Sequence, residues 1–190
     1  AVKFDVTEEN STEESGVTIV AVKLGNYAQK GIIKISKTGE VFASVTAADG
    51  VYQPVYTVQG LAGATYEIKA AADIYTPDGT LRCSAGEVVD TETTGADGMA
   101  ESKPLYLGKY EITEMKAPDG MVINKDAHTA ELVYAGQEIE ITETAASFCN
   151  DRQKARISLS KVLEQNKQFG IGMNNELSAV TFGFYAAEEL

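Results

Sequence analysis

The chain consists mainly of short segments in which apolar and polar residues alternate. This alternation is typical of β-strands with one buried face, and it occurs at residues 17–24, 32–37, 65–69, 105–107, 110–115, 130–134, 138–142 and 180–185. No window keeps a long 3.6-residue apolar period, so no long helix is predicted. Asp-Gly pairs, which favour tight turns, stand at 49–50, 78–79, 97–98 and 119–120. The pattern predicts an all-β fold, an antiparallel sandwich or barrel.

An internal repeat divides this pattern into modules. The segment NYAQKGIIKISK at 26–37 recurs as NDRQKARISLSK at 150–161, and two further pairs of segments match, 65–74 with 181–190 and 2–26 with 130–150. The matches predict three parts. Residues 1–29 are the last hairpin of one module, 30–154 form a complete module, and 155–190 are the first strands of a third. We therefore expect a tandem array whose end pieces expose sheet edges.

Three polar side chains are predicted on otherwise apolar strand faces. Counting by twos along each strand groups Lys37 with Ile33 and Ile35, Glu114 with Tyr110 and Ile112, and Asn150 with Phe148. The flanking parts repeat the pattern, with Asn26 after Val20, Val22 and Leu24, and Lys161 after Ile157 and Leu159. The sequence thus predicts an amine, a carboxyl and a carboxamide that face inward.

Burial would change the chemistry of these groups. Desolvation lowers the pKa of a lysine and raises the pKa of a glutamate, which favours a nucleophilic amine beside a protonated acid that polarises a carbonyl and shuttles protons. If the amine of Lys37 lies against the carboxamide of Asn150, attack forms an isopeptide bond and expels ammonia. The spacing also fits two other interpretations: a buried Lys–Glu ion pair beside a hydrogen-bonded Asn, or residues that reach solvent at strand ends.

The overall charge excludes several classes of partner. Asp and Glu number 28 against 16 Lys and Arg, which gives a net charge of -12 and a pI near 4.5. Phosphate backbones and anionic lipid surfaces would repel this surface, so nucleic acid is not an expected partner. No apolar run approaches the roughly 20 residues that span a bilayer, and no charged start precedes an apolar run. We expect no membrane insertion within this chain and any export signal to lie outside it.

Two cysteines and one histidine limit the metal and redox chemistry. Cys83 and Cys149 lie far apart, with no second Cys or His at metal-ligand spacing, so no metal or cofactor is expected. They form either a disulfide or two free thiols, and alternation places Cys149 on the face opposite Asn150. His128 is expected at the surface. Tyrosines in sandwiches commonly pack with the hydroxyl at the rim, which is the expectation for Tyr52, Tyr56, Tyr66 and Tyr75.

Four motifs, in order, resemble the collagen-adhesin B-type repeat, also called the SpaA-like prealbumin-like domain, of Gram-positive pilins and adhesins. The motifs are IKISK at 33–37, LAGATYEI at 61–68, LGKYEITEMKAPDG at 107–120 and FCN at 148–150. The resemblance covers all of about 30–154, and the flanks resemble a neighbour's end and beginning. It implies an inverse immunoglobulin-like sandwich, located outside the cell and usually anchored to the wall by sortase, with an intramolecular isopeptide bond.

The resemblance also assigns roles to residues. Lys37 matches the reactive lysine of the first strand, Glu114 the catalytic glutamate and Asn150 the acceptor in the last strand. By the same matching, Asn26 is the acceptor of the preceding module and Lys161 the amine of the following one. Neither has its catalytic Glu within this chain, so both are expected to be unreacted. Two departures concern the domain edge: residues 38–40 are Thr-Gly-Glu where an Asp usually follows the lysine, and 39–60 is longer than in a minimal repeat.

Two functional hypotheses follow from this resemblance. The first is a structural stalk module of a Gram-positive cell-surface adhesin or pilin, whose only chemistry is self-crosslinking and whose partners are the neighbouring repeats. The second is a ligand-binding adhesin module in which segments 39–60 and 75–103 recognise a host extracellular-matrix protein. A conventional enzyme is disfavoured, because a Ser-His-Asp set would need the single His128 and no carboxylate pair stands out.

Overall fold

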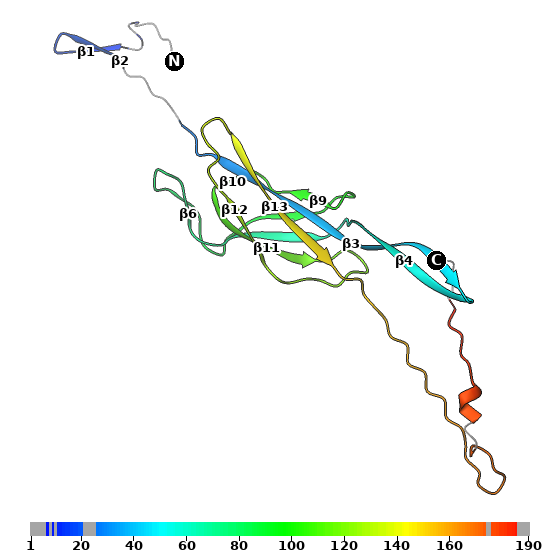
Figure 1. Ribbon diagram of the computed structural model, residues 1–190. Helices are drawn as coiled ribbons and strands as arrows, with labels where there is room; N and C mark the ends of the chain where they lie inside the picture. The colour runs from blue at the N-terminus through cyan, green and yellow to red at the C-terminus, as the bar shows by residue number, and fades with distance from the viewer. Residues whose placement is uncertain (1–6, 8, 10, 21–25, 174–175, 186–190) are drawn as a thin grey trace. The chain divides into compact units, whose positions relative to one another are not determined.

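The computed structural model describes residues 7, 9, 11–20, 26–173 and 176–185, and β-strands dominate it (Figure 1). The strands are β1 (Ser11–Glu14), β2 (Val17–Val20), β3 (Lys30–Ala48), β4 (Val51–Gly60), β5 (Thr65–Ala70), β6 (Ile74–Tyr75), β7 (Leu81–Cys83), β8 (Val88–Thr93), β9 (Met99–Glu101), β10 (Leu105–Tyr106), β11 (Gly108–Lys116), β12 (His128–Leu132) and β13 (Ile141–Asn150). A 3-10 helix, η1 (Glu176–Ala179), lies in the C-terminal part. The predicted all-β class is confirmed.

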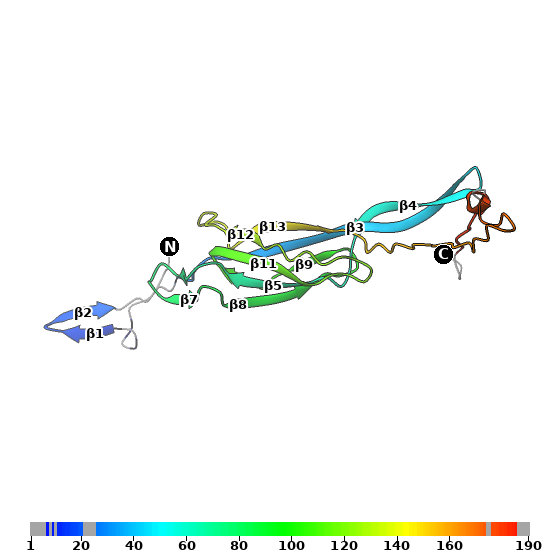
Figure 2. The same cartoon turned by 90° about the horizontal axis from the view of Figure 1, so that it is seen from below.

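Two sheets, built from strands between Lys30 and Asn150, form the sandwich, and these residues are called the module below. One has the order β12-β11-β5-β8 and is antiparallel throughout. The other is built on β3, which pairs along one edge with β10, β9 and β4 in turn and along its other edge with β13. Figure 2 shows β3 and β13 on one side of the module and β5 and β8 on the other.

The first and last strands of the module are neighbours and run parallel. Residues of β13 pair with β3 from Ile141↔Lys30 to Asn150↔Gly39. This is the exception to the expected antiparallel sandwich. It brings the start of β3 and the start of β13 to one end of the module and places Lys37 and Asn150 near the other.

Alternating side chains from both sheets fill the space between them. Their apolar members pack into one cluster, which includes Ile33, Ile35, Tyr66, Ile68, Tyr110, Ile112, Leu132 and Phe148. Because β3 reads buried at every second position from residue 31 to 39, its lysine at position 37 is carried inward with the isoleucines. Burying one large aliphatic or aromatic side chain contributes about 1.5–3 kcal/mol, so the register of these strands is strongly specified.

Segment 39–60 is an ordered hairpin, formed by the ends of β3 and β4. Pairing runs from Thr38↔Gly60 to Ala48↔Val51, with one bulge between Phe42 and Ser44. Asp49 and Gly50 make the turn with φ of 52° and 75°, the conformation that a two-residue hairpin turn requires. This hairpin, which we call the β3–β4 arm, projects beyond the sandwich (Figure 1).

The C-terminal part differs from the expected start of a third module. Of residues 155–173 and 176–185, the structure describes no strand; it has η1 and one isolated bridge, Asn166↔Ile171. The strand predicted at 180–185 and the one implied at 157–161 are therefore wrong for this chain. An alternating segment forms a strand only where a neighbour accepts its backbone hydrogen bonds, and the described residues supply none here.

The remaining expectations are confirmed in part. The N-terminal hairpin is present as β1 and β2 over 11–20, while residues 21–25 lie outside the described part. Strands overlap most other predicted segments. Of the strand predicted at 138–142, only residues 141 and 142 lie in a strand, because β13 begins at Ile141. No helix among the described residues is long and apolar enough to cross a membrane.

Candidate functional site

Lys37 is held by backbone contacts at the point where β3 changes partners. Its side chain lies on the inner face of the strand, and it is 1% exposed. The Lys37 N–H donates to the carbonyl of Gly98 at 2.7 Å, and its carbonyl accepts from the Leu61 N–H at 3.0 Å. The lysine backbone is therefore fixed by the end of β4 and by the loop before β9.

Two glycines make this close contact possible. A Cβ on Gly98, which has φ +77°, would lie 2.4 Å from the Lys37 carbonyl oxygen, and a Cβ on Gly60 would lie 2.1 Å from the carbonyl oxygen of Asp97. Real Cβ atoms do not approach backbone this closely. The Asp97-Gly98 pair was predicted only as a turn; its role at Lys37 depends on a crossing of two loops that are distant in sequence.

Glu114 stands where the regular pairing of β11 ends. Its side chain continues the inward face of Tyr110 and Ile112, and it is 1% exposed. The register between β11 and β5 shifts between Glu114 and Lys116, and such bulges re-aim side chains at the edges of sheets. The carboxyl group accepts a hydrogen bond at Oε2 from the Asn124 backbone N–H at 2.8 Å.

Asn150 completes the site from the last residue of β13. It is 4% exposed and pairs with Gly39, so it lies one strand away from Lys37 in the same sheet. Glu114 comes from the opposite sheet. The predicted inward faces of all three residues are confirmed by their burial.

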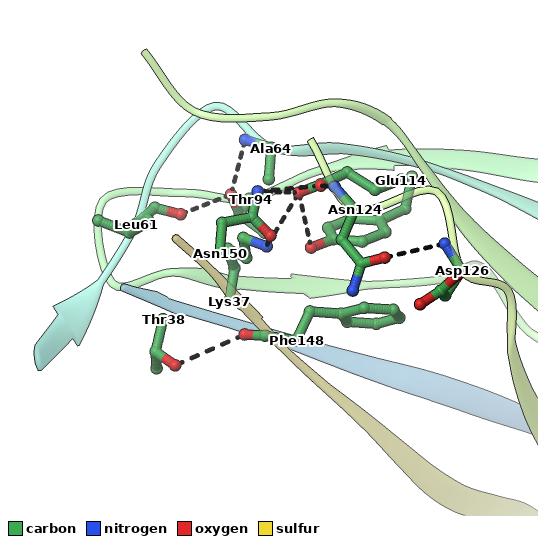
Figure 3. A network of polar contacts seen from close by, with 11 residues as sticks. Lys37, Thr38, Leu61, Ala64, Thr94, Glu114, Asn124, Asp126, Phe148 and Asn150 are labelled. Carbon is green, nitrogen blue, oxygen red and sulfur yellow. Dashed lines mark hydrogen bonds and ion pairs between the residues drawn. The ribbon is translucent and has the colours of Figure 1, made fainter. Parts of the chain in front are cut away.

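The three side chains form one polar cluster (Figure 3). The Lys37 Nζ lies 2.9 Å from Oε1 of Glu114, with both side chains fully buried, and it also donates to Oδ1 of Asn150. The Asn150 Nδ2 donates to Oε1 and Oε2 of Glu114 at 3.0 and 2.9 Å. One carboxyl group thus contacts both nitrogens, the amine and the amide.

Aromatic side chains enclose this cluster. Tyr66 is fully buried, its hydroxyl lies 3.4 Å from Oε1 of Glu114, and its ring is 4.6 Å from that of Phe148. The ring of the exposed His128 lies 4.4 Å from that of Phe148. Burial raises the pKa of Tyr66, and the Glu114 charge and hydrogen bond raise it further. The expectation that Tyr66 keeps its hydroxyl at the rim is wrong, because Glu114 gives that hydroxyl an interior partner.

The arrangement suits a reaction between two of its own members. Removing an unpaired charge from water costs several kcal/mol, and moving the proton of Lys37 to Glu114 leaves both groups neutral. The amine then lies against the carboxamide of Asn150, with no intervening apolar residue. The structure differs from the expected geometry in one respect: Glu114 contacts the amide nitrogen of Asn150, while Lys37 contacts the carbonyl oxygen.

The candidates in the flanking parts are not gathered into such clusters. Asn26 and Lys161 are both exposed, and no ion pair or hydrogen bond of either side chain is found within the described residues. Ile157 and Leu159 are 69% and 55% exposed, so the inward face predicted beside Lys161 does not form among the described residues. Val22 and Leu24 lie outside the described residues.

The two cysteines are free thiols in this structure, so the disulfide alternative is wrong. Cys83 lies in β7 and packs against the core, where burial raises the pKa of its thiol. Cys149 is exposed on the face opposite Asn150, as alternation predicted. Their strands belong to different sheets, β6-β7 and the β3 sheet.

The described residues contain no group of three or more His, Cys, Asp or Glu side chains placed to hold a metal ion. His128 is exposed, as predicted. The buried cluster itself contains an amine, a carboxyl and a carboxamide, from Lys37, Glu114 and Asn150.

Part of the chain matches a known protein family. Residues 55–145 match the family model described as SpaA, a prealbumin-like fold domain. Over these residues, the sandwich is similar to the SpaA-type prealbumin-like fold domain. A curated relative, the trypsin-resistant surface T6 protein of Streptococcus pyogenes serotype M6, is 31% identical over 74 residues, which are 38% of this chain and 14% of that protein.

Solved structures of pilins resemble the chain at low identity. The minor pilin GBS52 of Streptococcus agalactiae is 15% identical with a TM-score of 0.43, over 70% of this chain and 49% of that one. The major pilin SpaD of Corynebacterium diphtheriae is 21% identical with a TM-score of 0.41, over 65% and 30%. The chain thus spans half or less of the length of each of these relatives.

Proposed function

We propose that this chain is part of the stalk of a Gram-positive surface protein, and that its SpaA-type domain forms a covalent Lys37–Asn150 isopeptide bond with Glu114 as the catalytic group. The observation that carries the proposal is the contact of one buried carboxyl group with both the Lys37 amine and the Asn150 amide nitrogen. A carboxyl group in that position can take the proton that the nucleophile loses and return it to the leaving group.

The reaction balances without any co-reactant. Glu114 takes a proton from the Lys37 ammonium, and the neutral Nζ attacks Cγ of Asn150. Glu114 then delivers one proton to Nδ2, the Cγ–Nδ2 bond breaks, and the Lys37 nitrogen gives its second proton to the same carboxyl group, which ends protonated. The products are a Lys37–Asn150 amide and one ammonia.

Proximity and a dry environment take the place of an external catalyst. The strand pairing of β3 and β13 holds the nucleophile against its target, and holding two reactants together in this way can supply about 7–11 kcal/mol of the barrier. Both side chains are fully buried, so bulk water does not surround the amine and the carboxyl group. The reaction is a single turnover, so the domain is not an enzyme in the usual sense.

The bond would give the module its mechanical property. It would close a loop of 113 residues, which stabilises by about 5 kcal/mol in the loop-entropy account of crosslinks. Because β3 is the first strand and β13 the last, tension would enter along β3, cross at the Lys37–Asn150 bond and leave after Asn150. The strands between them would carry no load.

The array and its location belong to the same proposal. Modules 1–29, 30–154 and 155–190 would be successive repeats on the cell surface, anchored by a sortase signal outside this chain, with Asn26 and Lys161 unreacted. The matched T6 relative is named a surface protein, and the two solved relatives are pilins, which supports this location.

The intact mass of the purified chain tests the proposal. We expect a mass lower by one ammonia than the sequence requires, and the sequence mass itself for Glu114→Ala and Lys37→Ala, each corrected for its substitution. Lys161→Ala serves as the matched control and should still lose ammonia. A wild-type chain at the full sequence mass, in a folded state, would refute the crosslink.

A second candidate function rests on the β3–β4 arm. The arm exposes Phe42, Tyr52 and Val58 at 42%, 75% and 66%, and residues 41–58 contain neither Lys nor Arg. Such a surface would suit an adhesin that recognises a host extracellular-matrix protein. Binding of the wild-type chain to matrix proteins would support this function in addition to the stalk role if Tyr52→Ala abolishes the binding. The Tyr52→Ala variant should still lose one ammonia.

A further inference from the structure

The side chain of Gln29 ties the start of the module to the loop between β12 and β13. Its Oε1 accepts from the Ala135 N–H at 3.0 Å, and its Nε2 donates to the carbonyls of Gly136, at 3.1 Å, and Ile139. The three contacts use both N–H donors of the amide and one lone pair of its oxygen. A residue that precedes the first strand is therefore fixed to a loop more than a hundred positions away.

The repeat places the same residue type at the end of the module. Gln153 corresponds to Gln29 in the 26–37 and 150–161 segments, but here it uses its backbone: its N–H donates to the Gly120 carbonyl at 2.8 Å. Among the described residues, the exposed side chain of Gln153 makes no hydrogen bond. The module thus holds this position by the main chain and leaves the side-chain amide free.

The turn at 118–122 packs against residues 151–153, which follow the last strand of the module. The Asp151 carbonyl accepts from the Val122 N–H at 2.8 Å, and Met121 and Arg152 form an antiparallel bridge. By the repeat, residues 27–29 correspond to 151–153. They line a groove whose other walls include Tyr75, Pro77 and Tyr134, and Tyr27 is 97% exposed there.

We propose that this groove is the docking site for the preceding module, specifically for its turn equivalent to 118–122, and that the shared glutamine connects the two modules. This inference rests on the tandem-module part of the proposed function. The preceding turn would bind residues 27–29 as the 118–122 turn binds 151–153, and this would cover Tyr27. Gln153, in turn, would insert its side chain into the β12–β13 loop of the next module.

The consequence is a junction without a free linker. The backbone of the glutamine belongs to one module and its side chain to the next, so no residue between them can rotate independently. Flexible linkers that lack such contacts behave as random coils. A stalk built with the glutamine junction would transmit bending as well as tension between modules.

A duplicated chain tests the proposal: residues 1–153 followed directly by residues 30–190, so that Gln153 takes the place of Gln29 in the second copy. Amide hydrogen exchange should be at least tenfold slower at Ala135 of the second copy than in the same chain with Gln153→Ala. The 118–122 turn of the first copy should lose protection in the same variant. Gln59→Ala in both copies, on the exposed β3–β4 arm, is the matched control and should change neither.

Equal exchange with and without Gln153→Ala, at either place, would overturn the junction. The intact mass of the same samples reports the isopeptide bonds separately. Protection at Ala135 and at the turn without loss of ammonia would support the junction while contradicting the crosslink. Loss of two ammonia molecules with no change in exchange would support the crosslink and overturn the junction.

Discussion

Two tyrosines next to the buried cluster and in the core link stability to pH. Tyr66 and Tyr110 are fully buried, and burial raises the pKa of both above the ordinary tyrosine value. Each keeps its proton in the folded state at a pH where the unfolded chain has lost it. The free energy of unfolding should therefore be unaffected below about pH 10 and fall above it, by about 1.4 kcal/mol per pH unit for each tyrosine.

Urea unfolding between pH 9 and pH 11.5 measures this slope. Tyr66→Phe retains the ring against Phe148 and removes the titrating hydroxyl. Above about pH 10, the free energy of unfolding of this variant should therefore fall less steeply than that of wild type, by about 1.4 kcal/mol per pH unit. Tyr52→Phe, on the exposed arm, is the control and should leave the slope unchanged. Equal slopes for Tyr66→Phe and wild type would contradict the burial argument.

At the level of single residues, the sequence predicted the site better than its surroundings. The inward positions of Lys37, Glu114 and Asn150 were predictable because strand alternation is periodic. A polar residue at a position where the period expects an apolar one can be recognised from the sequence. The contacts of the Tyr66 hydroxyl and the Asn124 N–H with Glu114 were not predictable from the sequence. They depend on how closely the two sheets and the 117–127 loop approach each other. The free state of Cys83 and Cys149 likewise follows from their placement in different sheets.

At the level of elements, the crossing of Gly60 and Gly98 is what holds the backbone of Lys37. Gly98→Ala would force a Cβ into the Lys37 carbonyl oxygen and also place Ala at positive φ. We expect a loss of at least 3 kcal/mol, roughly the sum of left-handed strain and displaced packing, and incomplete crosslinking as Lys37 moves. Urea unfolding and intact mass measure the two effects.

Gly79→Ala is the matched control for this substitution. Gly79 has φ +78° but no atom within 4 Å of the Cβ position, so its replacement should cost only the conformational term, about 1–2 kcal/mol, with complete crosslinking. Equal losses for the two variants would show that the Gly98 contact does not position Lys37.

The strands themselves were predictable where one face is buried and obscured where both are exposed. The segments 32–37 and 110–115 alternate clearly because they line the core. The β3–β4 arm, at 39–60, has little buried surface to impose a period, and only its Asp49-Gly50 turn was visible. The parallel pairing of β3 with β13 is set by the topology of the whole sandwich, which no local pattern encodes.

At the level of the whole molecule, the crosslink should control how the chain responds to force. In a chain held at its two ends, wild type should not release the residues between Lys37 and Asn150. Glu114→Gln should release this whole segment, whose ends are 113 positions apart, in one step of up to about 400 Å of extended chain. Single-molecule force spectroscopy measures this step, and its presence in wild type at the same force would contradict the proposed load path.

The tandem array of modules is predicted from the internal repeat of the sequence. The fold of this chain provides little direct test of it. The repeat of 26–37 at 150–161 is visible in the letters, yet residues 157–161 form no strand in this chain. A strand is stabilised by its neighbours. Residues 157–161 can therefore carry the alternating pattern of a strand without forming one when the neighbouring strands are absent from the described residues. In the proposed junction, Gln29 and Gln153 are the positions at which such a neighbour would attach.

The central claim is the covalent bond between the first and last strands of the module, and peptide mapping tests it most directly. After proteolysis of the wild-type chain under denaturing conditions, we predict one linked pair of peptides, one containing Lys37 and the other Asn150, whose combined mass is lower by one ammonia. Recovery of the two peptides separately and in full yield, each at its own unmodified mass, would contradict the account.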